Sequence, residues 1–200
     1  MRVYDHTFAS PEENLAFDDQ LLESSCEALR FWESSVAFVV LGSSGRIEDE
    51  VNLNACEAGI PVLRRSSGGG TVVQGLGCLN YAFVLSLDVR PELLNVGGSY
   101  SIILNRIVRA LGVPGLEVFG SDMSLQRKKV SGNAQRRSRG WLLHHGTLLY
   151  RPDLWLMERV LLEPKRQPAY RERRTRRQFV SALNLPTEES KRRIMTAWGA

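Results

Sequence analysis

Residues 60–74 spell Ile-Pro-Val-Leu-Arg-Arg-Ser-Ser-Gly-Gly-Gly-Thr-Val-Val-Gln. The pattern predicts a strand over residues 60–65, a glycine loop over residues 66–70 and a second strand over residues 71–74. Three consecutive glycines let the backbone approach a ligand closely and turn successive N–H groups into one concavity that suits an anion. Arg64 and Arg65 add planar donors for a carboxylate or a phosphate. The stretch therefore predicts a small-ligand site, and a tight turn between two strands is the structural alternative.

This glycine loop differs from the common nucleotide-binding loops. No Gly-Lys-Ser/Thr follows it at the required spacing, which excludes a P-loop. The chain continues as Thr-Val-Val, which is a strand pattern rather than the start of a helix, and this excludes a dinucleotide-binding loop.

Length and composition indicate one globular domain. The 200 residues are 43% apolar and 24% charged, and both values are near the globular average. No run of about 18 apolar residues occurs, and residues 1–13 lack the apolar segment of a secretory signal. Cys26, Cys56 and Cys78 are odd in number and widely spaced, which disfavours disulfides and a zinc site. We therefore expect a cytoplasmic protein with no membrane partner.

The charges are unevenly distributed along the chain. Residues 1–100 hold 6 Lys and Arg against 14 Asp and Glu, whereas residues 101–200 hold 20 against 8. A basic half suits an anionic partner, which could be a phosphate-bearing ligand, an acidic protein or nucleic acid, or it is a solvated face. Aromatic residues are sparse among the arginines of the C-terminal part, and no zinc-finger or RNA-binding motif occurs. Nucleic acid is therefore the least favoured of these partners.

Hydrophobic periodicity predicts an α+β fold with mixed or antiparallel sheets packed with helices. The expected helices cover residues 14–30, 51–58, 100–111, 153–162 and 188–198. The expected strands cover residues 35–41, 60–65, 71–74, 80–87, 116–119 and 141–150, with a basic turn between the last two. Ser10, Pro11 and Glu13 form a helix-start signal ahead of the first helix.

A second informative stretch is Arg-Lys-Lys-Val-Ser-Gly-Asn-Ala-Gln at residues 127–135. It places Lys129 in a strand-like segment just before a turn of small residues. A lysine there can neutralise a phosphate and a carbonyl oxygen at once, and so stabilise charge on an acyl-phosphate leaving group. An exposed basic hairpin is the alternative interpretation.

The third stretch is Leu-His-His-Gly-Thr at residues 143–147. On a strand, His144 and His145 face opposite sides, so they do not readily bind one metal ion together. A hydrogen-bonded histidine in the core is the alternative interpretation. No Gly-x-Ser-x-Gly elbow occurs in the chain, which excludes the serine-hydrolase pattern.

Together the three stretches resemble the lipoate–protein ligase A family, within the biotin/lipoate protein ligase superfamily. That family carries Arg-Arg-x-Ser-Gly-Gly-Gly, Lys-x-Ser-Gly-Asn/Ser-Ala and His-His-Gly-Thr-Leu-Leu in this order, which correspond here to residues 64–70, 129–134 and 144–149. Shorter matches are residues 14–18, 50–52, 77–80 and 121–122. The resemblance runs from about residue 10 to residue 165.

The resemblance implies a ligase-like catalytic domain over residues 1–165, with an Arg-rich C-terminal tail over residues 166–200 packed on the same domain. It implies an enzyme that activates lipoate or octanoate with ATP and Mg²⁺, or receives a preformed acyl-adenylate, and passes the acyl group to a carrier lysine. The expected carriers are an acidic lipoyl carrier domain or a glycine cleavage H-like protein. The positive half would steer such a carrier to the site.

Carried over motif by motif, the resemblance implies that Lys129 is the catalytic residue and contacts the carbonyl and phosphate of the acyl-adenylate. Asp122 would lie near the nucleotide and hold Mg²⁺ through it. The other residues expected to bind the substrate or the acyl-adenylate are Arg64, Arg65, Ser67, Gly68, Gly69, Gly70, Thr71, Asn80, Ser131, Gly132, Asn133, His145, Gly146 and Thr147.

Three departures from the family pattern leave alternatives open. Only a short tail follows residue 165, where the family usually has an accessory domain or a separate partner chain, so a partner chain is one expectation. Gln74-Gly75 stands where the family usually has His-Asp. No cysteine follows Cys78, which disfavours the related transferases that form a cysteine thioester. The alternatives are an octanoyl or lipoyl transferase with an acyl carrier protein as donor, and a non-catalytic relative that binds a carrier or an adenylate.

Overall fold

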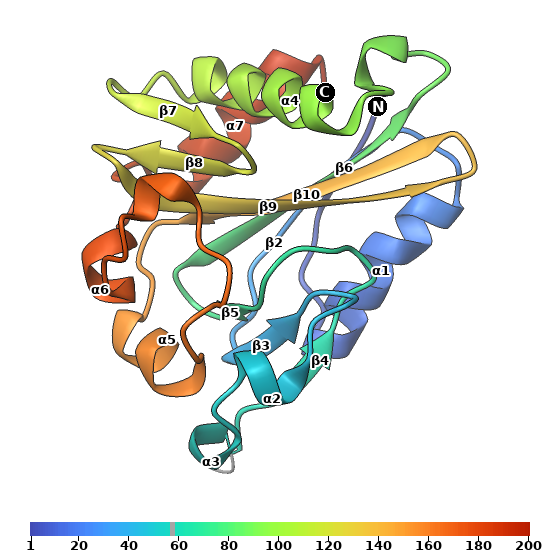
Figure 1. The fold of residues 1–200 in the computed structure, drawn as a ribbon. Coiled ribbons are helices and arrows are strands. Elements are labelled where there is room, and N and C mark those ends of the chain that lie inside the picture. The colour runs from blue at the N-terminus through green and yellow to red at the C-terminus, as the bar shows by residue number, and fades with distance from the viewer. Residues whose placement is uncertain (57–58) are drawn as a thin grey trace.

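A seven-stranded sheet is the centre of the computed structural model, which describes residues 1–56 and 59–200 (Figure 1). Its strands, in spatial order, are β1 (Arg2–Asp5), β2 (Ala28–Trp32), β6 (Cys78–Ser86), β10 (Trp141–Leu149), β9 (Lys128–Ser138), β8 (Asp122–Leu125) and β7 (Leu116–Phe119). Only the β1–β2 pair is parallel within this sheet. The sheet is therefore mixed and mostly antiparallel.

A second, three-stranded sheet carries the glycine loop. Its order is β4 (Val62–Arg64), β3 (Phe38–Leu41) and β5 (Val72–Gln74), with β3 parallel to β4 and antiparallel to β5. The loop connects β4 to β5, so the strand–loop–strand prediction for residues 60–74 is confirmed. The two sheets and their helices confirm the α+β fold class.

Helices cover both faces of the large sheet (Figure 1). The helices are α1 (Pro11–Glu23), α2 (Ile47–Glu50), α3 (Leu53–Cys56), α4 (Val96–Leu111), α5 (Leu154–Val160), α6 (Arg176–Phe179) and α7 (Thr187–Trp198), with 3-10 turns at Pro91–Leu93 and Ala169–Arg171. Along β6, Tyr81, Phe83 and Leu85 pack toward α4 and α7, whereas Ala82 and Val84 pack toward α1. This alternation is the period of a strand buried on both faces. No helix in the described ranges is long and apolar enough to cross a membrane.

The helix predicted over residues 14–30 is wrong in its second half. The start is confirmed, because Ser10 caps α1 and forms a capping box with Glu13. The helix ends at Glu23, and Ser25 adopts a positive φ of 50°. Residues 28–32 then form β2, in which every side chain is buried. Leucines spaced seven residues apart are typical of a longer helix. The helix ends before the serine pair at residues 24–25, and the segment after that pair forms a strand that pairs with β6.

The basic turn predicted between residues 119 and 141 is also wrong, because two strands lie there. β8 and the 11-residue β9 occupy this segment, and Ser131, Gly132 and Asn133 lie inside β9 rather than in a turn. The actual turns are at residues 126–127 and 139–140, where all four φ angles are positive. Small residues have low strand propensity, but pairing with β8 and β10 on both sides outweighs it.

Other predicted boundaries changed less. The helix expected over residues 51–58 corresponds in part to α3, and residues 57–58 lie outside the described ranges. β1 was not predicted at all, because its four residues are mostly exposed and carry no apolar alternation.

The C-terminal segment contributes to both main hydrophobic clusters. Leu183, Ile194 and Trp198 are buried in the core between the large sheet and α4. Tyr170 and Phe179 are buried in the second cluster, which lies under the small sheet and α5. Residues 166–200 therefore supply core side chains as well as surface arginines.

Ile194→Ala is expected to lower the free energy of unfolding by about 2–5 kcal/mol, because a fully buried side chain is truncated and leaves a cavity. Thr196→Ala, at an exposed position of the same helix, is the matched control and should change stability by less than about 0.5 kcal/mol. Urea unfolding followed by circular dichroism measures both. Equal stabilities of the two variants would contradict the assignment of α7 to the main core.

Candidate functional site

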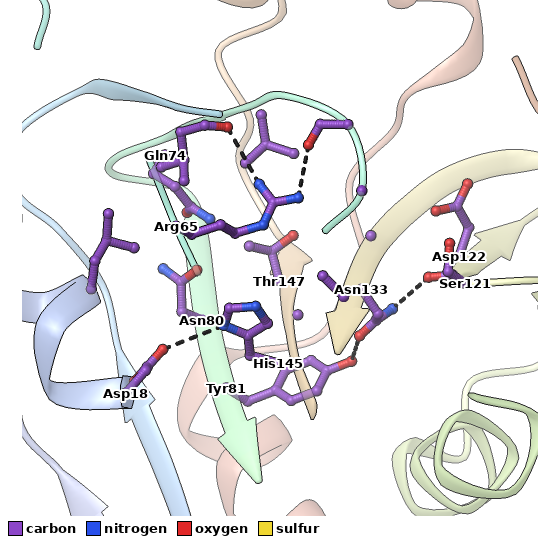
Figure 2. Close-up of a pocket in the computed structure, with 18 of the residues that line it drawn as sticks. Asp18, Arg65, Gln74, Asn80, Tyr81, Ser121, Asp122, Asn133, His145 and Thr147 are labelled. Carbon is purple, nitrogen blue, oxygen red and sulfur yellow. Dashed lines mark hydrogen bonds and ion pairs between the residues drawn. The ribbon is translucent and has the colours of Figure 1, made fainter. Parts of the chain in front are cut away.

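One pocket brings the three sequence motifs together (Figure 2). The glycine loop forms one wall, and β6, β9 and β10 of the large sheet form the floor. The predicted site residues that line it are Arg65, Gly69, Gly70, Asn80, Asp122, Lys129, Gly132, Asn133, His145, Gly146 and Thr147. Residues from positions 65 to 147 thus converge on one cavity, as the motif analysis predicts.

The remaining predicted residues do not line the pocket: Ser67 and Ser131 are buried, Gly68 and Thr71 are partly buried, and Arg64 is exposed. Arg64 donates to the carbonyl oxygens of Gly42 and Gly45 at 2.9 and 2.7 Å, so it holds a neighbouring loop. The Thr71 N–H donates to Glu50 Oε2 at 3.0 Å. The Gly68 carbonyl accepts from Arg65 Nη2 at 2.7 Å. Ser131 is fully buried and its Oγ accepts from Asn133, while the buried Ser67 bonds to His145 and Arg65. These residues shape the pocket rather than face it.

Arg65 organises the glycine loop. Its Nη2 donates to the carbonyls of Gly68 and Gly70 at 2.7 and 2.9 Å, and its Nε donates to Ser67 Oγ at 3.0 Å. Burial lowers the pKa of Arg65 to about 10, and the charge of Glu50 opposes that shift. The guanidinium is therefore still protonated at neutral pH, and it presents a fixed positive charge at the pocket wall.

Polar contacts with neighbouring side chains hold His145 in place on β10, at the floor of the pocket. His145 Nε2 shares a hydrogen bond of 2.6 Å with Ser67 Oγ, and His145 Nδ1 lies 3.6 Å from Asp18 Oδ2 (Figure 2). Asp18 in turn forms a 2.7 Å ion pair with Arg30, whose side chain is fully buried. Since His144 points into the core on the other face of β10, the predicted opposite orientation of the two histidines agrees with the structure.

The Asp122 carboxylate holds Lys129, and Tyr170 of the C-terminal segment orients that carboxylate. Lys129 Nζ lies 2.8 Å from Asp122 Oδ1, and the Tyr170 hydroxyl donates to Asp122 Oδ2 at 2.9 Å. Burial, and then the charge of Asp122, raise the pKa of Tyr170, so the phenol stays a donor. Tyr170 stacks on Phe119 with ring centroids 4.6 Å apart. The lysine ammonium is therefore placed at the pocket by a buried pair of neighbours.

Gly146 has no side chain because Asn133 occupies the space. A Cβ at Gly146 would lie 1.9 Å from Asn133 Oδ1 and 2.8 Å from the Tyr81 hydroxyl. Asn133 Oδ1 accepts from Tyr81, and Asn133 Nδ2 donates to the Ser121 carbonyl at 2.9 Å (Figure 2). The small residues of β9 and β10 thus make room for an amide that connects β6 to the β7–β8 turn.

The sequence analysis did not assign part of the lining to the site. These residues are Leu15, Asp18, Trp32, Val40, Val72, Gln74, Tyr81, Ser121 and Ala134. Asp18 had one usable signal, because it lies in residues 14–18, one of the shorter matches to the family pattern. The apolar members could not be told from ordinary core residues by pattern alone.

The described ranges contain no preformed cluster of metal ligands, and neither described cysteine side chain lies at the pocket. No group of three or more His, Cys, Asp or Glu side chains suited to a metal ion occurs there. Neither Cys26 nor Cys78 lines the pocket, and burial raises the pKa of Cys78 to about 12. A thiol with that pKa is almost entirely protonated at neutral pH and is a poor nucleophile.

The chain matches the family model described as the lipoyl protein ligase A/B catalytic domain over residues 10–196. Among curated relatives it is 30% identical over 158 residues to lipoate-protein ligase A of Psychrobacter cryohalolentis, covering 77% of this chain and 45% of that protein. It is 31% identical over 186 residues to an octanoyltransferase of Carboxydothermus hydrogenoformans, covering 80% of this chain and 68% of that protein. The chain spans about half the length of the curated ligases that it matches.

Two solved structures share the fold over 99% of this chain. One is a lipoate-protein ligase A bound with ATP, with a TM-score of 0.83, 24% identity and 83% of that chain covered. The other is the bipartite lipoate protein ligase of Thermoplasma acidophilum, described with its E2 lipoyl domain, with a TM-score of 0.82, 23% identity and 82% of that chain covered.

Acid should destabilise the protein through His144. Its ring is fully buried beside the rings of Tyr81 and Tyr100, and burial lowers its pKa from 6.5 to about 3. The unfolded chain takes up a proton near pH 6.5 and the folded chain does not, so stability is complete above that pH and falls as the pH decreases toward 3. Between pH 7 and pH 5 this residue alone should remove about 2 kcal/mol.

The measurement is urea unfolding at pH 7 and pH 5, for the unchanged protein and for His144→Asn. The variant should lose about 2 kcal/mol less stability over this interval, whatever its stability at pH 7. The same loss in both proteins would mean that His144 takes up its proton in the folded state.

Proposed function

The chain belongs to the lipoyl protein ligase A/B catalytic-domain family, and on that premise we propose that it attaches lipoate or octanoate to a carrier lysine through an acyl-adenylate. The observation that carries this proposal is the convergence of Lys129 with the glycine loop on one pocket. An ammonium, a guanidinium and a glycine loop that lets the backbone approach closely suit a ligand that carries both a carboxyl group and a phosphate.

In the proposed first step, a carboxylate oxygen of the acid attacks the α-phosphorus of ATP, and pyrophosphate leaves. In the second step, the carrier lysine attacks the acyl carbonyl as a free amine, the amide forms, and AMP and a proton leave. Lys129 contacts the carbonyl oxygen and the phosphate, where it stabilises the negative charge that develops in both steps. Asp122 holds the lysine ammonium in place through the 2.8 Å ion pair.

Mg²⁺ would reach this pocket together with the nucleotide. Proteins often hold this ion through one or two carboxylates and the substrate phosphates, with water completing the shell. Asp122 lines the pocket, and although Lys129 and Tyr170 each occupy one of its oxygens, a carboxylate oxygen has a second lone pair. The residues therefore fit the ion, with Asp122 as its protein ligand, and the ion supplies charge neutralisation at the phosphates.

A basic surface beside the lysine strand suits an acidic carrier. Arg127, Lys128 and Arg173 are exposed, and Arg174 donates to the Arg127 carbonyl at 2.9 Å, which joins the tail to the start of β9. Opposite charge on a lipoyl carrier domain or a glycine cleavage H-like protein would speed its encounter with this face. The described E2 lipoyl domain of the Thermoplasma ligase supports a carrier of this class.

An accessory partner chain is part of the proposal. The chain spans about half the length of the curated ligases, and the fold relative from Thermoplasma is bipartite. A partner would supply the part of those proteins that the chain does not match. The cytoplasmic location expected from the cysteines stays a prediction.

The experiment mixes the protein with a lipoyl carrier domain and reads the carrier mass. One reaction contains ATP, Mg²⁺ and lipoate or octanoate, and a parallel reaction contains synthetic lipoyl-adenylate. Modification in the first reaction means a self-sufficient ligase, and modification only in the second means a transferase that needs an activating partner. No modification in either reaction, with a folded protein, contradicts the proposal.

Lys129→Ala should reduce carrier modification by about a hundredfold or more with the fold intact, because one charge-stabilising group is removed. Lys165→Ala is the matched control, since its side chain is 73% exposed, does not line the pocket and lies outside the proposed carrier surface. Carrier mass over time gives both rates, and circular dichroism checks folding. Equal rates for the two variants would remove Lys129 from the catalytic assignment.

The alternative is an octanoyl transferase that uses an acyl carrier protein, and the similarity to the Carboxydothermus enzyme favours it. For this alternative, Cys78 is the candidate to form the thioester. Because it is buried, protonated and outside the pocket lining, Cys78→Ala should retain full activity with either donor. Trapping an acyl thioester on Cys78 by mass spectrometry would support the alternative instead.

A further inference from the structure

The ion pair of Lys129 includes a third residue that lies outside the pocket. Asp122 uses Oδ1 for the Lys129 ammonium at 2.8 Å and Oδ2 for the Tyr170 hydroxyl at 2.9 Å. Lys129 and Asp122 line the pocket, whereas Tyr170 is buried and does not line it. The Asp122 side chain is 9% exposed and the Lys129 side chain is 26% exposed, so the carboxylate lies deeper than the ammonium. The tyrosine therefore contacts the carboxylate from within the protein.

Two neighbours hold Tyr170 in place. Its ring stacks on Phe119, with the ring centroids 4.6 Å apart. Arg174 Nη2 donates to the Tyr170 carbonyl at 2.7 Å and to the Arg127 carbonyl at 2.9 Å. Because Arg127 is the residue before β9, this guanidinium ties the tyrosine backbone to the strand that carries the catalytic lysine. The position of the hydroxyl is therefore fixed relative to that strand.

Gly132 leaves the space that the end of the Lys129 side chain occupies. A Cβ at Gly132 would lie 2.8 Å from Lys129 Nζ, 2.9 Å from its Cε and 3.8 Å from Asp122 Oδ1. The ammonium therefore lies over bare backbone of β9, with the carboxylate beside it. Since a lysine side chain is flexible, the place of its ammonium follows the place of this carboxylate.

We propose that Tyr170 is a positioning residue for acyl transfer, and that it acts on Lys129 through Asp122. Without the hydroxyl, Asp122 Oδ2 is a buried acceptor that has lost its donor, and the carboxylate turns readily because the χ2 torsion of aspartate is broad. The ammonium is then shared between both oxygens and leaves its place in the pocket. A misplacement of about 1 Å can reduce a rate by about a hundredfold. This inference rests on the proposed function, in which Lys129 is the catalytic group.

Tyr170→Phe is the test variant, because it removes the hydroxyl and keeps the ring that stacks on Phe119. Carrier mass is followed over time with synthetic lipoyl-adenylate as the donor. This reaction contains neither ATP nor Mg²⁺, so a contact of Asp122 with the ion plays no part in the result. We expect kcat to fall about tenfold and the KM for the adenylate to change less than about threefold, because Lys129 acts on charge that develops in the transition state.

Tyr150→Phe is the matched control. The Tyr150 hydroxyl also donates to a carboxylate, that of Glu33, and neither of these residues lines the pocket. The control therefore loses the same kind of hydrogen bond at a place away from the site. It should keep the kcat of the unchanged protein, and urea unfolding compares the stabilities of the two variants.

A double-mutant cycle separates positioning from a structural role. In the Lys129→Ala background, Tyr170→Phe should change kcat by less than about twofold, because the group that it positions is absent. A structural role would reduce the rate by the same factor with and without Lys129. If Tyr170→Phe does not fold, Arg174→Gln takes its place, since it releases the tyrosine backbone from the strand and keeps the hydroxyl. Its kcat should fall severalfold only where Lys129 is present.

Full kcat in Tyr170→Phe, or the same loss in both backgrounds, would overturn this inference and leave the proposed function standing. In the first case a bound water would replace the hydroxyl at Asp122. Absence of carrier modification by the unchanged, folded protein would overturn the proposed function itself.

Discussion

The pocket depends on a positive charge that is buried beside it. Arg30 is fully inaccessible, and its guanidinium donates to Asp18 Oδ1, to Asn14 Oδ1 and to the Asn14 carbonyl at 2.6–2.7 Å. The rings of Phe17 and Trp32 lie 4.9 and 5.2 Å from it. A buried charge is tolerated only with such partners, and loss of one partner typically costs about 3–5 kcal/mol. This requirement fixes α1 on β2 and determines where Asp18 lies.

A series of direct contacts links Asp18 to the glycine loop. Asp18 faces His145, His145 shares a hydrogen bond with Ser67, and Ser67 accepts from Arg65, which in turn holds the carbonyls of Gly68 and Gly70. Two elements far apart in sequence, α1 and the β4–β5 loop, are therefore placed relative to one another by polar contacts across β10. A site built on such contacts is already ordered before a ligand arrives, which reduces the entropy cost of binding.

The sequence predicted the motifs better than the elements that carry them. The glycine loop, Lys129 and His145 were assigned to one site through the resemblance of three ordered motifs to a known family, and all three line one pocket. The strand β2 could not be predicted, because an arginine such as Arg30 is typical of the end of a polar helix, and its partners on α1 are known only from the structure. The strand β9 could not be predicted either, because Ser131, Gly132 and Asn133 favour a turn by local propensity. Tyr170 carried no signal, because its role comes from contact with Asp122, 48 residues away.

The C-terminal segment contacts both Lys129 and its counter-ion Asp122. Val180 forms a parallel bridge with Lys129, the Ser181 N–H donates to the Lys129 carbonyl at 2.9 Å, and Tyr170 holds Asp122. The segment therefore completes the pairing of β9 at the residue that matters most for the proposed chemistry. The sequence predicted an Arg-rich tail packed on the same domain, and a peptide that fixes both the backbone and the counter-ion of Lys129 belongs to the site.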